Sequence, residues 1–240
     1  KDKKLFYSVN LSGAEILTEQ IKRAGVNSVV YTSTSAVFGI PRINPITFEM
    51  SPAPAEEYGR AKYEAEKIFT SLIDIGVNLA IIRPRTILGT GRLGIFQILF
   101  EWVYQGKNIP VLGEGDNLYQ FVHALDLASA CIAAGEIKGS GVYNIGAKEF
   151  CSMKKTLEGL IEHANTKSKV VGVNKNIAKI CMNITSSLGL SPLGKYHALM
   201  YGESMYFDIS NAVRDLNYVP IYSNVKMFQD SYDWYLKNRD

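Results

Sequence analysis

Tyr58 and Lys62 are the residues whose types and spacing point most directly to a chemistry. If residues 54–75 form a helix, the two side chains lie about one turn apart on the same face, so the ammonium group can approach the phenol. A free phenol has a pKa of about 10, and a fixed positive charge beside it favours the phenolate. The pair therefore predicts a tyrosine that exchanges a proton at neutral pH, as hydride transfer at a secondary alcohol requires.

Thr34 is a second candidate for the same chemistry. It follows a short β-branched run at 28–32, which predicts a buried parallel strand. Ligands of open α/β sheets collect at the carboxyl ends of such strands. We expect the Thr34 hydroxyl to bind the substrate oxygen while Tyr58 exchanges its proton; an ordinary strand-end hydroxyl is the alternative.

The elements that must position these residues alternate along the chain. Residues 9–24 have helical spacing and end at Gly25, residues 77–82 form an apolar strand, and Pro54 is expected in the first turn of the helix carrying Tyr58. This order of helix, strand, helix and strand predicts part of a doubly wound parallel sheet. After Pro84 the pattern becomes irregular. Further strands are expected at 109–112 and 119–123, and further helices at 93–105, from Asp126, 152–163, 175–186, 210–216 and 224–237.

The Tyr-x-x-x-Lys pair with its upstream hydroxyl resembles the active site of the short-chain dehydrogenase/reductases. The resemblance is closer to their extended branch, the NAD-dependent epimerase/dehydratases. Six further stretches match that family in order: 10–13, 28–39, 83–84, 121–126, 143–146 and 207–212.

The resemblance implies an α/β fold: a Rossmann-like doubly wound parallel sheet, of which the C-terminal half is present, with a smaller α/β substrate-binding domain. Residues 1–88, joined by 120–146, would belong to the cofactor domain, and residues 89–119 and 147–240 to the substrate domain. The family's Gly-rich turn, which seats the cofactor pyrophosphate, would precede residue 1. We therefore expect the sequence to be a piece of a longer protein.

The family's functional positions can be carried over by motif. The resemblance assigns the catalytic roles to Thr34, Tyr58 and Lys62. Cofactor contacts are implied for Ser33, Tyr58, Lys62, Arg83, Pro84 and Thr86, and substrate contacts for Thr34, Ser35, Arg85, Thr86 and Tyr119. The cofactor is expected to be NAD or NADP, and the sequence does not choose between them. The family's dimers form through the helices expected here at 9–24 and 54–74, so a homodimer is predicted.

Two features of the sequence narrow the reaction and the substrate within the range found in the family. Its dehydratases carry an Asp-Glu pair where this chain has Ser35-Ala36, which disfavours dehydration and leaves epimerisation or simple dehydrogenation and reduction. A nucleotide sugar is the expected substrate. Family members that bind such sugars often have an arginine where this chain has Tyr119. An apolar substrate, as in the hydroxysteroid-dehydrogenase and dihydroflavonol-reductase relatives, is therefore the alternative. An inactive cofactor-sensing or RNA-binding scaffold is disfavoured by the intact triad.

Composition excludes several classes of protein. The formal net charge of +3 comes from 26 basic and 23 acidic residues, so no nucleic-acid partner is expected, and the basic residues at 1–4 are interpreted as a solvated end. Cys131, Cys151 and Cys181 lie far apart, which predicts neither a disulfide framework nor a metal site and fits a reducing cytoplasm. No segment is long and apolar enough to predict a membrane span.

Some motifs allow two interpretations. Residues 89–94 match Gly-x-Gly-x-x-Gly, but residues intervene between this motif and the strand at 77–82, so a loop over the substrate is favoured over a phosphate-binding turn. Asn10 either caps a helix or belongs to the family's helix beneath the active site. His123 is interpreted as a structural histidine, and Asp126 as a helix cap.

Overall fold

The computed structural model describes residues 3–174 and 202–239. The chain divides into two compact units: unit 1 comprises 1–85, 126–146 and 207–219, and unit 2 comprises 86–125, 147–206 and 220–240. Parallel strands flanked by helices confirm the predicted α/β class. The predicted domain boundaries differ from these units mainly in placing 207–219 in the substrate domain, and the domain assignment stays a prediction.

The sheet of unit 1 positions the candidate site. Its three parallel strands are β1 (Ser28–Thr32), β2 (Asn78–Pro84) and β6 (Gly141–Ile145), in the order β1-β2-β6. The register aligns Thr32 with Ile82, so the chain leaves β1 and β2 at the same edge of the sheet. The central strand β2 is buried along nearly its whole length, which explains its continuous apolar run.

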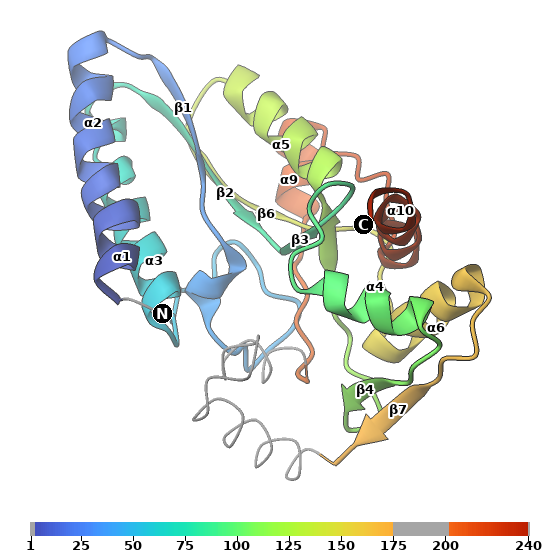
Figure 1. Ribbon diagram of the computed structural model, residues 1–240. Coiled ribbons are helices and arrows are strands. Elements are labelled where there is room, and N and C mark those ends of the chain that lie inside the picture. The colour runs from blue at the N-terminus through green and yellow to red at the C-terminus, as the bar shows by residue number, and fades with distance from the viewer. Residues whose placement is uncertain (1–2, 175–201, 240) are drawn as a thin grey trace. The chain divides into compact units, whose positions relative to one another are not determined.

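Helices cover both faces of this sheet (Figure 1). Helices α2 (Gly13–Ala24) and α3 (Glu57–Thr70) pack on one face, where their apolar side chains meet alternate strand residues such as Val29 and Tyr31. Helix α5 (Ala124–Glu136) lies on the other face. Its Gly135 would place a Cβ 3.5 Å from Val30, a residue of opposite parity on β1. Helix α9 (Ser210–Leu216) packs beside β6.

The first helix begins earlier than predicted. Helix α1 (Lys3–Tyr7) continues through the π-helix η1 (Ser8–Ser12) into α2, so the helix begins earlier than residue 9. Asn10 lies inside the π-helix, and its Nδ2 donates to the Phe6 carbonyl at 3.0 Å rather than capping a helix end. Lys3 and Lys4 are exposed, as expected of a solvated end, and Lys3 also forms a surface ion pair with Glu57 at 2.9 Å.

Unit 2 has two small parallel pairs and an aromatic core. Strand β3 (Thr86–Leu88) pairs with β5 (Phe121–His123), and β4 (Ile109–Leu112) pairs with β7 (Val170–Val173). Its helices are α4 (Phe96–Tyr104), α6 (Met153–Ala164) and α10 (Asn224–Asn238). The rings of Phe96, Phe121 and Phe228 meet edge to face, at centroid distances between 5.1 and 5.5 Å.

Several predicted boundaries need correction. Helix α3 begins at Glu57, because residues 51–55 remain irregular, so Pro54 lies before the helix rather than in its first turn. Asp126 is the third residue of α5 rather than its cap, because the helix begins directly after β5. The short strands β3 and β7 were not predicted. The helix expected at 175–186 lies outside the described residues.

Candidate active site

Lys62 lies at the carboxyl end of β1. Its Nζ donates to the Thr32 carbonyl at 2.8 Å and lies 4.2 Å from the centroid of the Tyr31 ring. An ammonium group has three hydrogens, so this bond leaves donors for a ligand. Burial lowers the pKa of Lys62 to about 8, and the nearby Glu66 carboxylate opposes that change. Lys62 is therefore a cation at neutral pH, but it loses its proton at a lower pH than an ordinary lysine does.

Tyr58 occupies the first turn of α3, one turn before Lys62, as the spacing predicts. It is half-buried, and its ring lies 5.8 Å from the ring of Phe6 on α1. Burial raises the pKa of Tyr31, and the charges of Glu66 and Tyr58 add to that rise. Tyr31 therefore remains a neutral phenol, with the Lys62 ammonium group over its ring.

Thr34 caps the 3₁₀ helix η2 (Ser35–Phe38) that follows β1. Its Oγ1 accepts a hydrogen bond from the Ala36 amide at 3.2 Å. A hydroxyl that accepts from the backbone keeps its own hydrogen for donation. The geometry therefore suits Thr34 to donate to a substrate oxygen, the role predicted for it.

Gly59 brings the helix that carries Tyr58 against the turn that Thr34 caps. A Cβ built on Gly59 would lie 2.4 Å from the Ala36 carbonyl oxygen and 3.2 Å from the Pro54 Cβ. Only a residue without a side chain allows α3 to approach η2 this closely. The contact explains a glycine inside a helix, where it costs about 1 kcal/mol relative to alanine.

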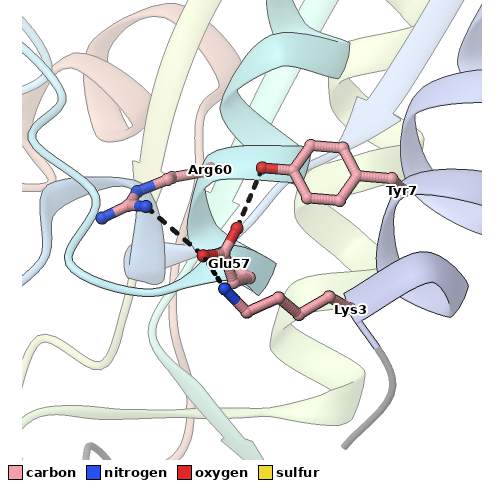
Figure 2. A network of polar contacts seen from close by, with 4 residues as sticks. All are labelled: Lys3, Tyr7, Glu57 and Arg60. Atoms are coloured by element: carbon pink, nitrogen blue, oxygen red, sulfur yellow. Dashed lines mark hydrogen bonds and ion pairs between the residues drawn. The ribbon is translucent and has the colours of Figure 1, made fainter.

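A polar network of exposed and half-buried side chains is centred on Glu57, the residue before Tyr58 (Figure 2). The Glu57 carboxylate accepts from Lys3 Nζ at 2.9 Å, from the Tyr7 hydroxyl at 3.1 Å and from Arg60 at 3.4 Å. The hydrogen bond from Lys3, and then that from Tyr7, hold the pKa of Glu57 below its usual value. The bond to Glu57 in turn raises the pKa of Tyr7. This network ties α1 to the start of α3.

Arg83 and Arg85, predicted near the cofactor and substrate, both have buried side chains. Arg83 is 5% exposed, and its guanidinium donates to the Glu66 carboxylate at 3.0 and 2.6 Å. Arg85 is 2% exposed and lies over the ring of Phe207, at 5.4 Å from the centroid. These positions give both residues roles in the interior of unit 1, and their contacts to ligands stay predictions.

The other predicted residues of unit 1 lie at the same edge of the sheet. Ser33 follows β1, and its amide donates to the Ile82 carbonyl at 2.7 Å. Its Oγ is buried and has no hydrogen-bond partner within the described residues. Ser35 opens η2, and Pro84 ends β2. The sheet edge thus holds a buried hydroxyl and a half-buried ammonium with donors to spare, a set that fits the hydroxyl groups of a nucleotide cofactor.

Thr86 and Tyr119 belong to unit 2, where their hydroxyl oxygens lie 3.0 Å apart. The motif at 89–94 directly follows the short strand β3, and it remains separated from β2, the strand predicted at 77–82. It opens with a turn in which the Arg92 amide donates to the Gly89 carbonyl at 3.0 Å, and the choice between a substrate loop and a phosphate-binding turn stays a prediction. His123 is buried, accepts from the Leu125 amide at 3.2 Å and stacks on Tyr222.

The described part of the chain has neither a metal-binding cluster nor a membrane-spanning helix. Residues 3–174 and 202–239 contain no group of three His, Cys, Asp or Glu side chains arranged to hold a metal ion. None of the helices in these ranges combines the length and apolarity needed to cross a membrane. Cys131 and Cys151 are free thiols, and Cys181 lies outside the described residues.

Sequence reasoning missed two residues that shape this site, Gly59 and Glu66. The signal for Gly59 was available, because a glycine between Tyr58 and Lys62 weakens a helix and so implies a close approach. Glu66 follows Lys62 by one turn and could have been placed on the same helix face. Its partner on β2, however, depends on the tertiary fold.

Comparisons with known proteins agree with this architecture. A family model described as the NAD dependent epimerase/dehydratase family matches residues 1–146. The Sinorhizobium fredii protein y4nG is 52% identical over the whole chain, which spans 61% of that relative. UDP-glucose 4-epimerase 4 of Oryza sativa subsp. japonica is 26% identical over 98% of the chain, which spans 64% of that enzyme. The chain therefore spans less than two thirds of the length of either relative.

A solved structure shows the same fold. The crystal structure of UDP-glucuronic acid 4-epimerase from Bacillus cereus in complex with NAD covers 100% of this chain at a TM-score of 0.79 and 20% identity, and the match spans 71% of that enzyme. The fold is therefore shared, although the sequences have diverged.

Proposed function

Because the chain belongs to the NAD dependent epimerase/dehydratase family, we propose that its protein is an NAD-dependent epimerase acting on a nucleotide sugar. The observation that carries the proposal is Lys62, which the Thr32 carbonyl holds at the carboxyl end of β1, one helical turn from Tyr58. The rice and Bacillus cereus relatives, named for UDP-glucose and UDP-glucuronic acid, support this substrate class. Epimerisation is favoured over dehydration because Ser35-Ala36 offers no additional acid and base.

The chain's own residues would divide the work as follows. Tyr58 removes the proton from the substrate hydroxyl as the carbinol carbon is oxidised, and returns it when the carbon is reduced. The Lys62 cation favours the Tyr58 phenolate and retains donors for the cofactor's ribose hydroxyls. Thr34 donates its hydroxyl hydrogen to the substrate oxygen. Bound NAD supplies a hydride acceptor, which is the part of the chemistry that side chains lack.

Other assignments of the site are proposals of the same kind. Ser33 and Pro84 at the sheet edge would contact the cofactor, while Ser35, Thr86 and Tyr119 would contact the sugar nucleotide.

A homodimer through the helices at 9–24 and 54–74 is supported by exposed apolar side chains on α2, including Ile16 at 63% and Leu17 at 51%. A cytoplasmic location is supported by the free thiols at 131 and 151.

The test is turnover by the full-length protein, followed by NMR of the sugar. With NAD present, we expect UDP-glucose or UDP-glucuronic acid to be converted to its epimer. Tyr58→Phe should reduce kcat by about 10²- to 10⁴-fold, the usual contribution of general acid/base catalysis. Tyr63→Phe is the matched control, because this tyrosine lies on the same helix with its ring under Lys67. Turnover of hydroxysteroids alone, or full activity of Tyr58→Phe, would overturn the proposal.

A further inference from the structure

We propose that the buried pair of Glu66 and Arg83 is a positioning device for Lys62: it fixes α3 against β2 and places a carboxylate one turn beyond the ammonium group. The inference rests on the proposed function, in which the Lys62 cation acts on Tyr58. It assigns to Arg83 a role through another side chain rather than a direct contact with a ligand.

The geometry of the pair is that of a rigid link between two elements. Both nitrogens of the Arg83 fork donate to the Glu66 carboxylate, at 3.0 and 2.6 Å, and the two side chains are 6% and 4% exposed. Two parallel hydrogen bonds fix orientation as well as distance. The Arg83 guanidinium also lies over the ring of Phe38 in η2, at 5.1 Å from the centroid. The pair therefore connects α3, β2 and the turn capped by Thr34.

Lys62 and Glu66 share one face of α3. Residues four apart lie one above the other on a helix, and both side chains contact groups of the sheet: Thr32 on β1 for Lys62 and Arg83 on β2 for Glu66. Each side chain thus holds α3 to a different strand. Movement of α3 along the sheet would break both contacts and carry Tyr58 away from the strand ends.

The groups around Lys62 change its pKa in opposite directions. From β1, the neutral Tyr31 phenol contributes to its burial; from α3, Glu66 favours its protonated form. Tyr58 lies one turn earlier, and Cys131 on α5 lies 3.8 Å from the Thr32 hydroxyl. Burial raises the pKa of the Cys131 thiol, which leaves it neutral near pH 8. Since desolvation disfavours the ammonium form, Glu66 is the group that extends the protonated range of Lys62 towards higher pH.

The experiment is a direct titration of the Lys62 side chain in the full-length protein. Lysine labelled with ¹³C at Cε is followed by NMR from pH 6 to 11, and the Lys62 signal is assigned by its loss in Lys62→Arg. We expect the midpoint to fall by about one pH unit in Glu66→Gln, because an opposite charge near the ammonium has been removed. Because that variant leaves Arg83 buried without its carboxylate, a Glu66→Met/Arg83→Met double variant, which holds no buried charge, is measured as well.

Helix α3 offers a matched control, Glu64→Gln. Glu64 has the same charge and lies two residues from both Lys62 and Glu66, but it pairs with Lys67 at the surface. Its removal should leave the Lys62 midpoint unchanged. An unchanged midpoint in the folded double variant, or an equal fall in Glu64→Gln, would overturn the proposal.

A second readout links the titration to activity. The alkaline limb of the kcat/KM profile should move to lower pH together with the Lys62 midpoint in Glu66→Gln and in the double variant. A purely structural pair would lower Tm without moving either curve. If the midpoint falls as expected but no sugar nucleotide is turned over by the unmodified protein, the proposed function fails while the positioning role of the pair stands.

Discussion

Helix α3 carries one carboxylate at its first residue and another near its last turn, and their surroundings differ. Glu57 lies at the surface and accepts hydrogen bonds from three side chains, Lys3, Tyr7 and Arg60 (Figure 2). Glu66 is 3% exposed, and the partner it holds is Arg83 on β2. The first connects the helix to a neighbouring helix, and the second connects it to the sheet.

The number of hydrogen bonds that each carboxylate accepts does not tell which of the two holds α3 more firmly. At the surface, water screens an ion pair and competes for its hydrogen bonds, so its net stabilisation is small. In the interior, neither charge can be removed alone without leaving the other desolvated, so the two residues act as a unit. Tyr58 and Lys62 lie between the two carboxylates, and we infer that their positions depend on the buried one.

Arg83→Met should have the largest effect on stability. It leaves the Glu66 carboxylate buried without its partner, which costs about 3–5 kcal/mol of unfolding free energy. Urea unfolding of the full-length protein measures the loss. The Glu66→Met/Arg83→Met double variant should recover most of it, since apolar replacements of a buried pair are often neutral. A single variant within about 1 kcal/mol of the original protein would contradict the view that the pair acts as a unit.

Gly59→Ala tests the close contact between α3 and the turn that Thr34 caps. The added methyl group would lie 2.4 Å from the Ala36 carbonyl oxygen and 3.2 Å from the Pro54 Cβ. Because neither atom can move without the backbone, the free energy of unfolding should fall by about 1–3 kcal/mol. We expect kcat to fall as well, because α3 moves away from the turn that Thr34 caps. Gly135→Ala on α5 is the control, since its Cβ would make an ordinary 3.5 Å contact with Val30. That substitution should stabilise the protein slightly.

The residues in this comparison show what the sequence can and cannot predict. Tyr58 and Lys62 were placed correctly on one helix because helical spacing is a local property. The strand at 28–32 and the helix at 210–216 were predicted with their observed bounds, the strand from its short β-branched run. The α/β class followed from the order of these elements.

The rest depended on contacts between distant residues. The sequence gives no local sign that Lys3 meets Glu57 or that Glu66 meets Arg83. The short strands β3 and β7 are defined by their pairing with β5 and β4, which lie far from them in the sequence. Arg83 was expected near the cofactor because it follows a strand, and only the packing of α3 on β2 shows that its side chain is held in the interior.

Lys62→Met should raise stability while abolishing activity, because burial places the folded-state pKa of Lys62 at about 8, below its ordinary value of 10.5. The unfolded chain therefore binds more protons than the folded one between these values, so the cost of burying the cation is full below pH 8 and is relieved by pH 10.5. With allowance for partial exposure and for the lost bond to Thr32, we expect a gain of about 1 kcal/mol at pH 7 that shrinks above pH 8.

Urea unfolding of Lys62→Met and the original protein at pH 7, 8.5 and 10 measures this dependence. Lys67→Met is the control, because Lys67 is exposed and the hydrogen bond to Glu64 raises its pKa instead. It should not stabilise the protein at any of these pH values. A Lys62→Met variant that is less stable than the original at pH 7 would show that the bond to Thr32 outweighs the desolvation of the cation.

Glu57→Gln should have the smallest effect, although it disturbs more hydrogen bonds than any other substitution considered. Two of its three partners, Lys3 and Arg60, are exposed and can turn to water, so we expect only a slight fall in Tm at pH 7 and low salt. Since the pKa of Glu57 is lowered from 4.5, its contribution is present above that value and lost as the pH falls through the lower folded value. The difference in Tm should therefore vanish in strong acid and also in about 1 M salt, where charges are screened within about 3 Å. If Glu57→Gln instead costs as much as Arg83→Met and resists salt, the surface network is the stronger anchor of α3, and burial does not explain which carboxylate holds this helix.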